Sequence, residues 1–198
     1  MHCQKETCKT IVHKGGNYVF GLKGNHKNFY TSVDSFFSNE ITPEYVEEFI
    51  THEKNAGRKE TRICRKVSNI DWLECKKDWP GLKTVFMIRR ISVSKHKSTD
   101  EVSYYISSLD VSAEELLSIS REHWKIESMH WLLDVAFSED ECKLLSENGH
   151  KTLNSLRKLA LLLHRHFIES LPKKCSIKRS LLNCLLDEDA LVLLLESL

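Results

Sequence analysis

The feature that most constrains the fold is a change of sequence texture near residue 109. Between about residues 58 and 109 the chain has three runs that are rich in β-branched and aromatic residues and are separated by turn-forming residues. This pattern predicts strands at residues 60–67, 82–93 and 102–109, arranged as an antiparallel insertion. Everything after Leu109 has the pattern of helices. We therefore expect an α/β fold with a β-rich insertion and a helical C-terminal region.

The residues before the strand-rich block alternate between helix and strand. Residues 4–14 predict a short helix, and the pair of glycines that follows is suited to a left-handed C-terminal cap. Residues 17–23 are β-branched and aromatic and predict a central strand. Residues 28–50 predict two helices, the second starting at Pro43.

Three helices are expected after the strand-rich block. Ser112 and Glu115 have the spacing of a capping box, which predicts a helix from about residue 112 to 137. A second helix is expected at residues 152–170. After a short basic linker, the leucine-rich residues 178–197 predict a last helix, amphipathic enough to pack on the body or on a partner.

Charge is strongly segregated along the chain, although the formal net charge is only +1. Residues 51–99 hold 13 basic and 5 acidic side chains, which gives +8. Residues 100–147 hold 3 basic and 12 acidic side chains, or −9, and residues 148–180 hold 8 and 1, or +7. Acidic residues between basic blocks fit an enzyme that holds phosphates and divalent metal. Solvated helix faces explain the same pattern.

Composition excludes several classes of protein. No apolar run reaches the roughly 18 residues of a membrane span, and the first residues do not form a secretory signal, so we expect a cytoplasmic protein without a membrane partner. The seven cysteines form no Cys-x-x-Cys pair. Reduced thiols are therefore expected, with neither a disulfide framework nor structural zinc.

The most informative segment is residues 121–134. In a helix, His123, Glu127, His130 and Asp134 fall on one stripe, because successive residues are about 100° apart. We expect this stripe to lie at the edge of the core, where the Glu127 carboxylate would be semi-buried and held rigidly. Such a carboxylate is a candidate metal ligand.

The same helix has an apolar face beside the stripe, formed by Ile119, Ile126, Leu133 and Phe137, with Trp124 and Trp131 adjacent. Two alternatives follow. A zinc site would use both histidines, but their spacing of seven residues is not a His-Glu-x-x-His arrangement. Otherwise the histidines and tryptophans only line a packed helix, and the carboxylates face water.

Several ordered stretches make the chain resemble the Asp-Asp-Glu transposases of bacterial insertion sequences, in the branch of the ISAs-type transposases and the H-repeat-associated proteins. The stretches are residues 3–6, 15–19, 22–25, 57–62, 79–83, 104–109, 123–127, 130–135 and 156–160. Each is weak alone, but their order is specific.

The resemblance implies an incomplete RNase H-like (integrase-like) catalytic fold, with a central mixed sheet flanked by helices. It assigns residues 1–171 to a truncated catalytic domain, with the insertion at about 58–109 and the catalytic-glutamate helix at about 112–137. Residues 172–198 form a C-terminal helix. The family's second aspartate is followed almost at once by a segment like residues 1–5, so we expect both upstream aspartates to be missing.

By this resemblance, Glu127 is the catalytic glutamate and a ligand of Mg²⁺ or Mn²⁺, and His123, His130 and Asp134 are accessory groups. The implied reaction cuts and joins DNA strands by two-metal phosphodiester transfer. A single carboxylate binds Mg²⁺ poorly, so we expect weak or no metal binding and little or no activity from this chain alone.

DNA is the implied partner, as transposon ends and as target. Lys23 and Asn25 follow a predicted strand, and Arg58 and Arg62 head the basic insertion, so these four are candidate phosphate contacts or else solvated turn residues. A second copy of the chain or a full-length transposase is the implied protein partner. The alternatives to an enzyme are a non-catalytic regulator that binds DNA or the transposase, and a gene remnant.

Overall fold

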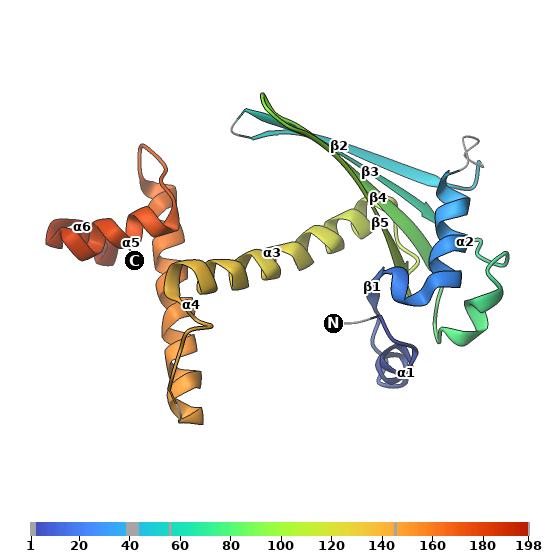
Figure 1. Ribbon diagram of the computed structural model, residues 1–198, viewed down its shortest axis with the longest axis horizontal. Coiled ribbons are helices and arrows are strands. Elements are labelled where there is room, and N and C mark those ends of the chain that lie inside the picture. Colours follow the sequence, from blue (N-terminus) through green and yellow to red (C-terminus); the bar gives the residue numbers. More distant parts are fainter. Residues whose placement is uncertain (1–2, 39–43, 56, 145, 198) are drawn as a thin grey trace. The chain divides into compact units, whose positions relative to one another are not determined.

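The computed structural model describes residues 3–38, 44–55, 57–144 and 146–197 (Figure 1). The chain divides into two compact units, residues 1–122 and residues 123–198, and each is described by itself. Helix α3 (Ala113–Phe137) begins in the first unit and ends in the second. Among the described residues, no helix is both long enough and apolar enough to cross a membrane.

The first unit is built on a five-stranded sheet in the order β1-β5-β4-β3-β2, in which every pairing is antiparallel. The strands are β1 (Val19–Leu22), β2 (Glu47–Asn55), β3 (Arg58–Val67), β4 (Thr84–Val93) and β5 (Ser98–Ser107). The three predicted strands of the insertion are confirmed. Short connections join β2 to β3 and β4 to β5, and such connections permit only antiparallel pairing. The expected mixed sheet is not found among the described strands.

Two predictions for the N-terminal half are wrong. Residues 47–50 belong to β2 and not to a helix, because they pair with residues 63–66 of β3. The expected helix start at Pro43 lies outside the described residues. The strand β1 is an edge strand and not a central one, since it pairs only with β5 in the described sheet.

Helix α1 (Lys5–His13) is confirmed, together with its glycine cap. The chain reverses at Gly15, whose φ of +73° is accessible to glycine at little cost, and the Gly16 N–H donates to the Ile11 carbonyl at 2.9 Å. Gly81 also has a φ of +73°, and a Cβ there would lie 2.9 Å from Cγ2 of Val12. The turn at Gly81 therefore packs closely on α1.

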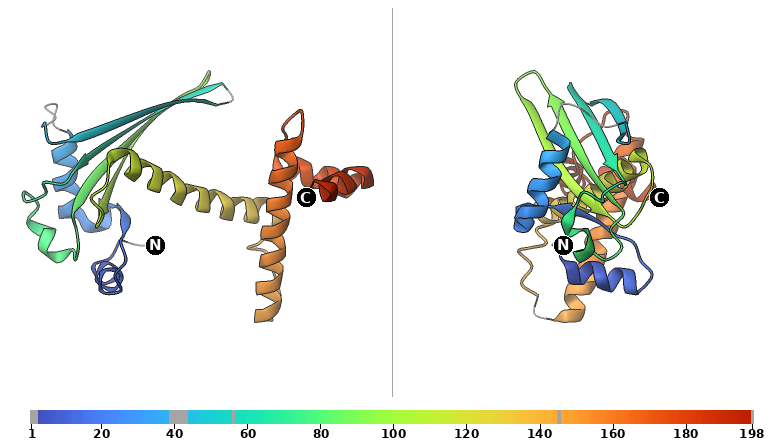
Figure 2. Two further views of the ribbon diagram at one scale, coloured as in Figure 1. Left: turned by 180° about the vertical axis from the view of Figure 1, so that it is seen from behind. Right: turned by 90° about the vertical axis from the view of Figure 1, so that its right-hand side faces the viewer.

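Helices cover both faces of the sheet (Figures 1 and 2). Helix α2 (Lys27–Ser38) contributes Phe29, Val33 and Phe37 to the core of one face, which includes Val85 and Ile106 of the sheet. The first turns of α3 cover the other face. Its core consists of Ala113, Leu116 and Leu117 of α3 with Cys64, Phe86 and Ile88 of the sheet. Side chains alternate between the faces along each strand, so one sheet supplies both cores.

The second unit consists of the end of α3 followed by α4 (Glu147–Ser170), α5 (Ile177–Leu186) and α6 (Glu188–Glu196) (Figure 2). The single last helix predicted from the leucine pattern is wrong, because the Asp187 side chain accepts the Asp189 N–H at 3.0 Å and caps a new helix. A buried hydrogen bond of 2.8 Å between His164 Nδ1 and Ser180 Oγ joins α4 to α5.

Candidate functional site

The helix that carries Glu127 is fixed at its first turn. Ser112 Oγ accepts the Glu115 N–H at 3.2 Å, and the Glu115 carboxylate accepts the Ser112 N–H at 3.3 Å. The predicted capping box is therefore confirmed. Glu47 of β2 adds a long-range cap, since its Oε1 accepts the Ala113 N–H at 2.8 Å. Negative charge at this end also interacts favourably with the helix dipole.

Glu127 itself lies on an exposed stretch of α3. Its side chain is 54% exposed, and its Oε1 lies 3.4 Å from Nε2 of His123, one turn earlier. All residues from 121 to 128 are exposed, so the expectation of a semi-buried Glu127 is wrong for the described chain. A helix buries a side chain only where another element packs on it, and the packing of α3 on the sheet ends at Ser120.

The apolar neighbours of Glu127 share this exposure. Trp124 and Trp131 are 59% and 61% exposed, and Ile126 is also exposed. Of the four residues of the predicted apolar face, only Leu133 is buried. The predicted packing of this helix is therefore wrong around residue 127. Trp124 and Trp131 neighbour Glu127 one helical turn before and after it, so this stretch of the helix is a candidate contact surface.

The stripe predicted around Glu127 is only partly assembled. His123 and Glu127 form a contact, His130 is exposed and Asp134 is half-buried. Among the residues that the structure describes, no three histidine, cysteine or acidic side chains come together as a metal site would require. The described side chains alone therefore fit neither a zinc site nor a complete two-metal site.

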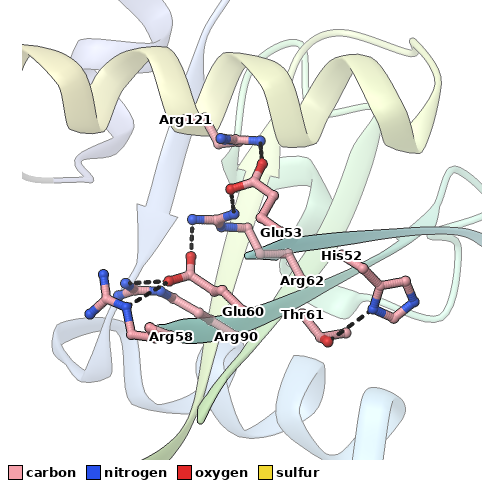
Figure 3. A network of polar contacts seen from close by, with 8 residues as sticks. All are labelled: His52, Glu53, Arg58, Glu60, Thr61, Arg62, Arg90 and Arg121. Carbon is pink, nitrogen blue, oxygen red and sulfur yellow. Dashed lines mark hydrogen bonds and ion pairs between the residues drawn. The ribbon is translucent and has the colours of Figure 1, made fainter. Parts of the chain in front are cut away.

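A cluster of arginines lies on the α3-facing side of the sheet (Figure 3). The buried Glu60 carboxylate contacts Arg62, receives a 3.0 Å hydrogen bond from Arg90, and lies 3.9 Å from Nε of Arg58. Arg62 and Arg90 occupy directly opposite positions on β3 and β4. Like charges at such positions repel, so Glu60 is what allows them to stay together.

Glu53 extends this cluster to α3. Its carboxylate accepts hydrogen bonds from Arg62 at 2.9 Å and from Arg121 at 2.5 Å. These two hydrogen bonds lower the pKa of Glu53 below its usual value, and the bond from Arg62 has the larger effect. Glu53 therefore stays ionised near neutral pH and links the β2–β3 hairpin to the N-terminal part of α3.

The four predicted DNA contacts do not form one site. Lys23 and Asn25 are exposed and follow the edge strand β1. Arg58 and Arg62 are on β3, which is separated from β1 by β4 and β5. Arg62 is largely enclosed by its two ion pairs, with 17% of its side chain exposed, so it is poorly placed to meet a phosphate.

Sequence reasoning missed four members of the cluster, namely Glu53, Glu60, Arg90 and Arg121. The alternation Arg58-x-Glu60-x-Arg62 was a usable signal, because residues two apart in a strand share a face. No comparable signal pointed to Arg90, whose place beside Glu60 depends on the β3–β4 register.

Comparison with known proteins assigns the class. The sequence profile of the transposase DDE domain matches residues 1–163, and the chain belongs to this family. The predicted resemblance is confirmed. The putative transposase YncI of Escherichia coli O157:H7 is 35% identical over 172 residues, which are 83% of this chain and 44% of that protein. The H repeat-associated putative transposase YhhI of Escherichia coli K12 is 31% identical over 170 residues, which are 81% of this chain and 44% of that protein.

These relatives are much longer than the aligned region. The chain spans less than half the length of the curated relatives that it matches. No solved structure matches the chain. The family assignment covers α3 and Glu127, because both lie within residues 1–163.

Proposed function

We propose that this chain is the C-terminal part of a DNA transposase of the RNase H-like class, which cuts and joins DNA strands by phosphodiester transfer. Glu127 is the acidic residue that we assign to catalysis and to metal binding. The observation that carries the proposal is the family match over residues 1–163, which includes the exposed Glu127 on α3. The reaction would hydrolyse a phosphodiester and then use the freed 3′-hydroxyl to attack target DNA.

Glu127 does not form a metal site with the other described residues. Mg²⁺ prefers six oxygen ligands in octahedral geometry, and proteins usually hold it with one or two carboxylates together with substrate phosphates. The described part of the chain brings no three metal-binding side chains together. We infer that the partner aspartates belong to the larger part of the full-length protein, and that this chain alone neither binds Mg²⁺ or Mn²⁺ tightly nor cleaves DNA.

The exposed surroundings of Glu127 support this arrangement. Trp124, Ile126 and Trp131 present apolar surface to solvent on the same helix. Burying an exposed large side chain of this kind stabilises an interface by roughly 1.5–3 kcal/mol. A surface that combines these side chains with a carboxylate is suited to receive the aspartate-bearing part of the protein. His123, His130 and Asp134 would then be accessory polar groups around Glu127.

The test is strand cleavage and joining by a full-length protein that carries this sequence, assayed on transposon-end DNA with Mg²⁺. Glu127→Gln keeps the size of the side chain but removes its charge, and we expect it to lower cleavage by about a hundredfold or more. Glu114→Gln, at an exposed acidic position on the same helix, is the matched control and should stay close to the unmodified protein. Equal activity of the two variants would sink the assignment of Glu127.

A second candidate function is a non-catalytic regulator that binds DNA or a full-length transposase. The arginine cluster and the solvent-exposed Glu127 favour it. Lys23 and Asn25 remain candidate phosphate contacts in either case, because both are exposed. Salt-dependent DNA binding by this chain that survives Glu127→Gln, together with inhibition of the full-length enzyme, would select the regulator. Aggregation of the purified chain without DNA binding would select a gene remnant.

A further inference from the structure

The arginines of the cluster are of two kinds. Some are paired with carboxylates within the protein, and others keep N–H donors that a ligand can use. Arg62 donates from Nη1 to Glu53 at 2.9 Å and is also paired through Nη2 with Glu60. Both terminal nitrogens of its guanidinium group are therefore engaged. Arg121 donates to Glu53 at 2.5 Å. These two arginines hold the hairpin and the helix together. Their donors are directed at carboxylates within the protein (Figure 3).

Arg58 and Arg90 are different. The Arg58 side chain is 54% exposed, and its contact with Glu60 is a loose one of 3.9 Å. The Arg90 side chain is 42% exposed, with a 3.0 Å bond to Glu60 and a looser approach of 3.8 Å to the exposed Glu101. In the described part of the chain, Nε of Arg90 is buried without a hydrogen-bond partner, so an outside ligand would meet the terminal nitrogens of this side chain. Their contacts with Glu60 and Glu101 do not use every N–H, and both arginines therefore retain donors for a ligand from outside the chain.

The Glu60 carboxylate orients these two arginines. Only 8% of its side chain is exposed, and it lies between Arg58, Arg62 and Arg90. A buried carboxylate loses its water and is stable as an ion only when it is paired with positive charge. Its charge therefore holds the guanidinium groups of Arg58, Arg62 and Arg90 close together, although these residues come from two strands. The cluster keeps one excess positive charge, because Arg58, Arg62, Arg90 and Arg121 (+4) contact Glu53, Glu60 and Glu101 (−3).

We propose that Arg58 and Arg90 form a phosphate-binding pair that holds the DNA backbone, with Glu60 as the residue that positions them. The inference rests on the proposed function for its ligand, which is DNA. Guanidinium groups bind phosphate oxygens through paired N–H donors, and a group already held in place loses less freedom on binding. Arg58 and Arg90 belong to residues 51–99, which carry a net charge of +8. Because this charge is spread over many side chains, it favours a long polyanion such as DNA over a short acidic peptide.

This proposal changes the predicted set of contacts. Arg58 stays as a phosphate contact. Arg62 becomes an internal brace, because its guanidinium group is enclosed by carboxylates. Arg90, on the neighbouring strand, takes its place as the second contact.

The test measures binding of this chain to random-sequence duplex DNA by fluorescence anisotropy, over a series of salt concentrations and with EDTA present. Each lost phosphate contact lowers the slope of log affinity against log salt by about 0.9. We expect that reduction for Arg58→Ala and for Arg90→Ala, and about twice as much for the double variant. Binding should also weaken at every salt concentration.

Arg89→Ala is the matched control. Arg89 adjoins Arg90 on β4 but lies on the opposite face of the sheet, where it pairs with Asp100 at 2.6 Å. The Arg89→Ala substitution removes the same charge as Arg58→Ala or Arg90→Ala, so an effect of net charge alone would appear equally in all three variants. We expect its salt slope to remain that of the unmodified chain. Circular dichroism confirms folding, and Arg58, which is largely exposed, provides a variant that does not disturb the core.

Two results would overturn the proposal. One is a double variant with the same slope and affinity as Arg89→Ala, and the other is the absence of DNA binding by the unmodified chain. Both are independent of the proposed catalytic role, because EDTA removes the metal and no cleavage is measured. Conversely, a Glu127→Gln enzyme that cleaves normally would refute the catalytic assignment and leave the phosphate-binding pair intact.

Discussion

Replacing Glu60 by glutamine tests whether one buried carboxylate holds the arginine cluster together. Glu60 is 7% exposed and contacts three arginines. Removing one partner of a buried ion pair costs roughly 3–5 kcal/mol, because the remaining charge is left without compensation. Here Arg62 keeps its bond to Glu53, and Arg58 and Arg90 can regain water. We therefore expect the free energy of unfolding to fall by about 2–3 kcal/mol.

The assay is urea unfolding followed by tryptophan fluorescence. Trp79 is buried in the first unit at 2% exposure and reports its unfolding, whereas Trp124 and Trp131 are already exposed. Glu101→Gln is the control, because Glu101 is exposed and lies 3.8 Å from Arg90. It should change stability by less than about 0.5 kcal/mol. If Glu60→Gln costs no more than Glu101→Gln, the cluster is a set of ordinary surface pairs and the reasoning is refuted.

Three further predictions concern the rest of the fold. Burial lowers the pKa of His164 from its ordinary value of 6.5, so unfolding takes up a proton below that pH. In urea titrations, the free energy of unfolding of the second unit should therefore fall as the pH drops below about 6.5. The fall should be smaller in His164→Gln, and His166→Gln, at an exposed position, is the control. Gly81→Ala should destabilise more than Gly57→Ala by thermal melting, because both have positive φ but only the first methyl would meet another side chain within 3 Å. Burial raises the pKa of Cys64 to about 12, so iodoacetamide should modify it in the native chain more slowly than in urea, as read by mass spectrometry; equal rates would contradict its burial.

Local signals in the sequence determined much of the secondary structure. Ser112 and Glu115 marked the start of α3 because a capping box depends only on residues within one turn. The glycine pair after α1 marked its end for the same reason. Periodicity identified the strands β3, β4 and β5, and ordered motifs identified the transposase family, which the profile over residues 1–163 confirmed.

Long-range pairing decided what these signals left open. Residues 47–50 have a helix-like pattern, but pairing with β3 makes them a strand, since hydrogen bonds to a neighbouring strand outweigh a weak local preference. The position of β1 at the sheet edge, the meeting of Arg90 with Glu60 and the exposure of Glu127 likewise depend on register and packing. A sequence fixes which side chains share a helix stripe or a strand face, because that follows from backbone geometry within one element. Which other elements cover those side chains is decided only when the chain packs.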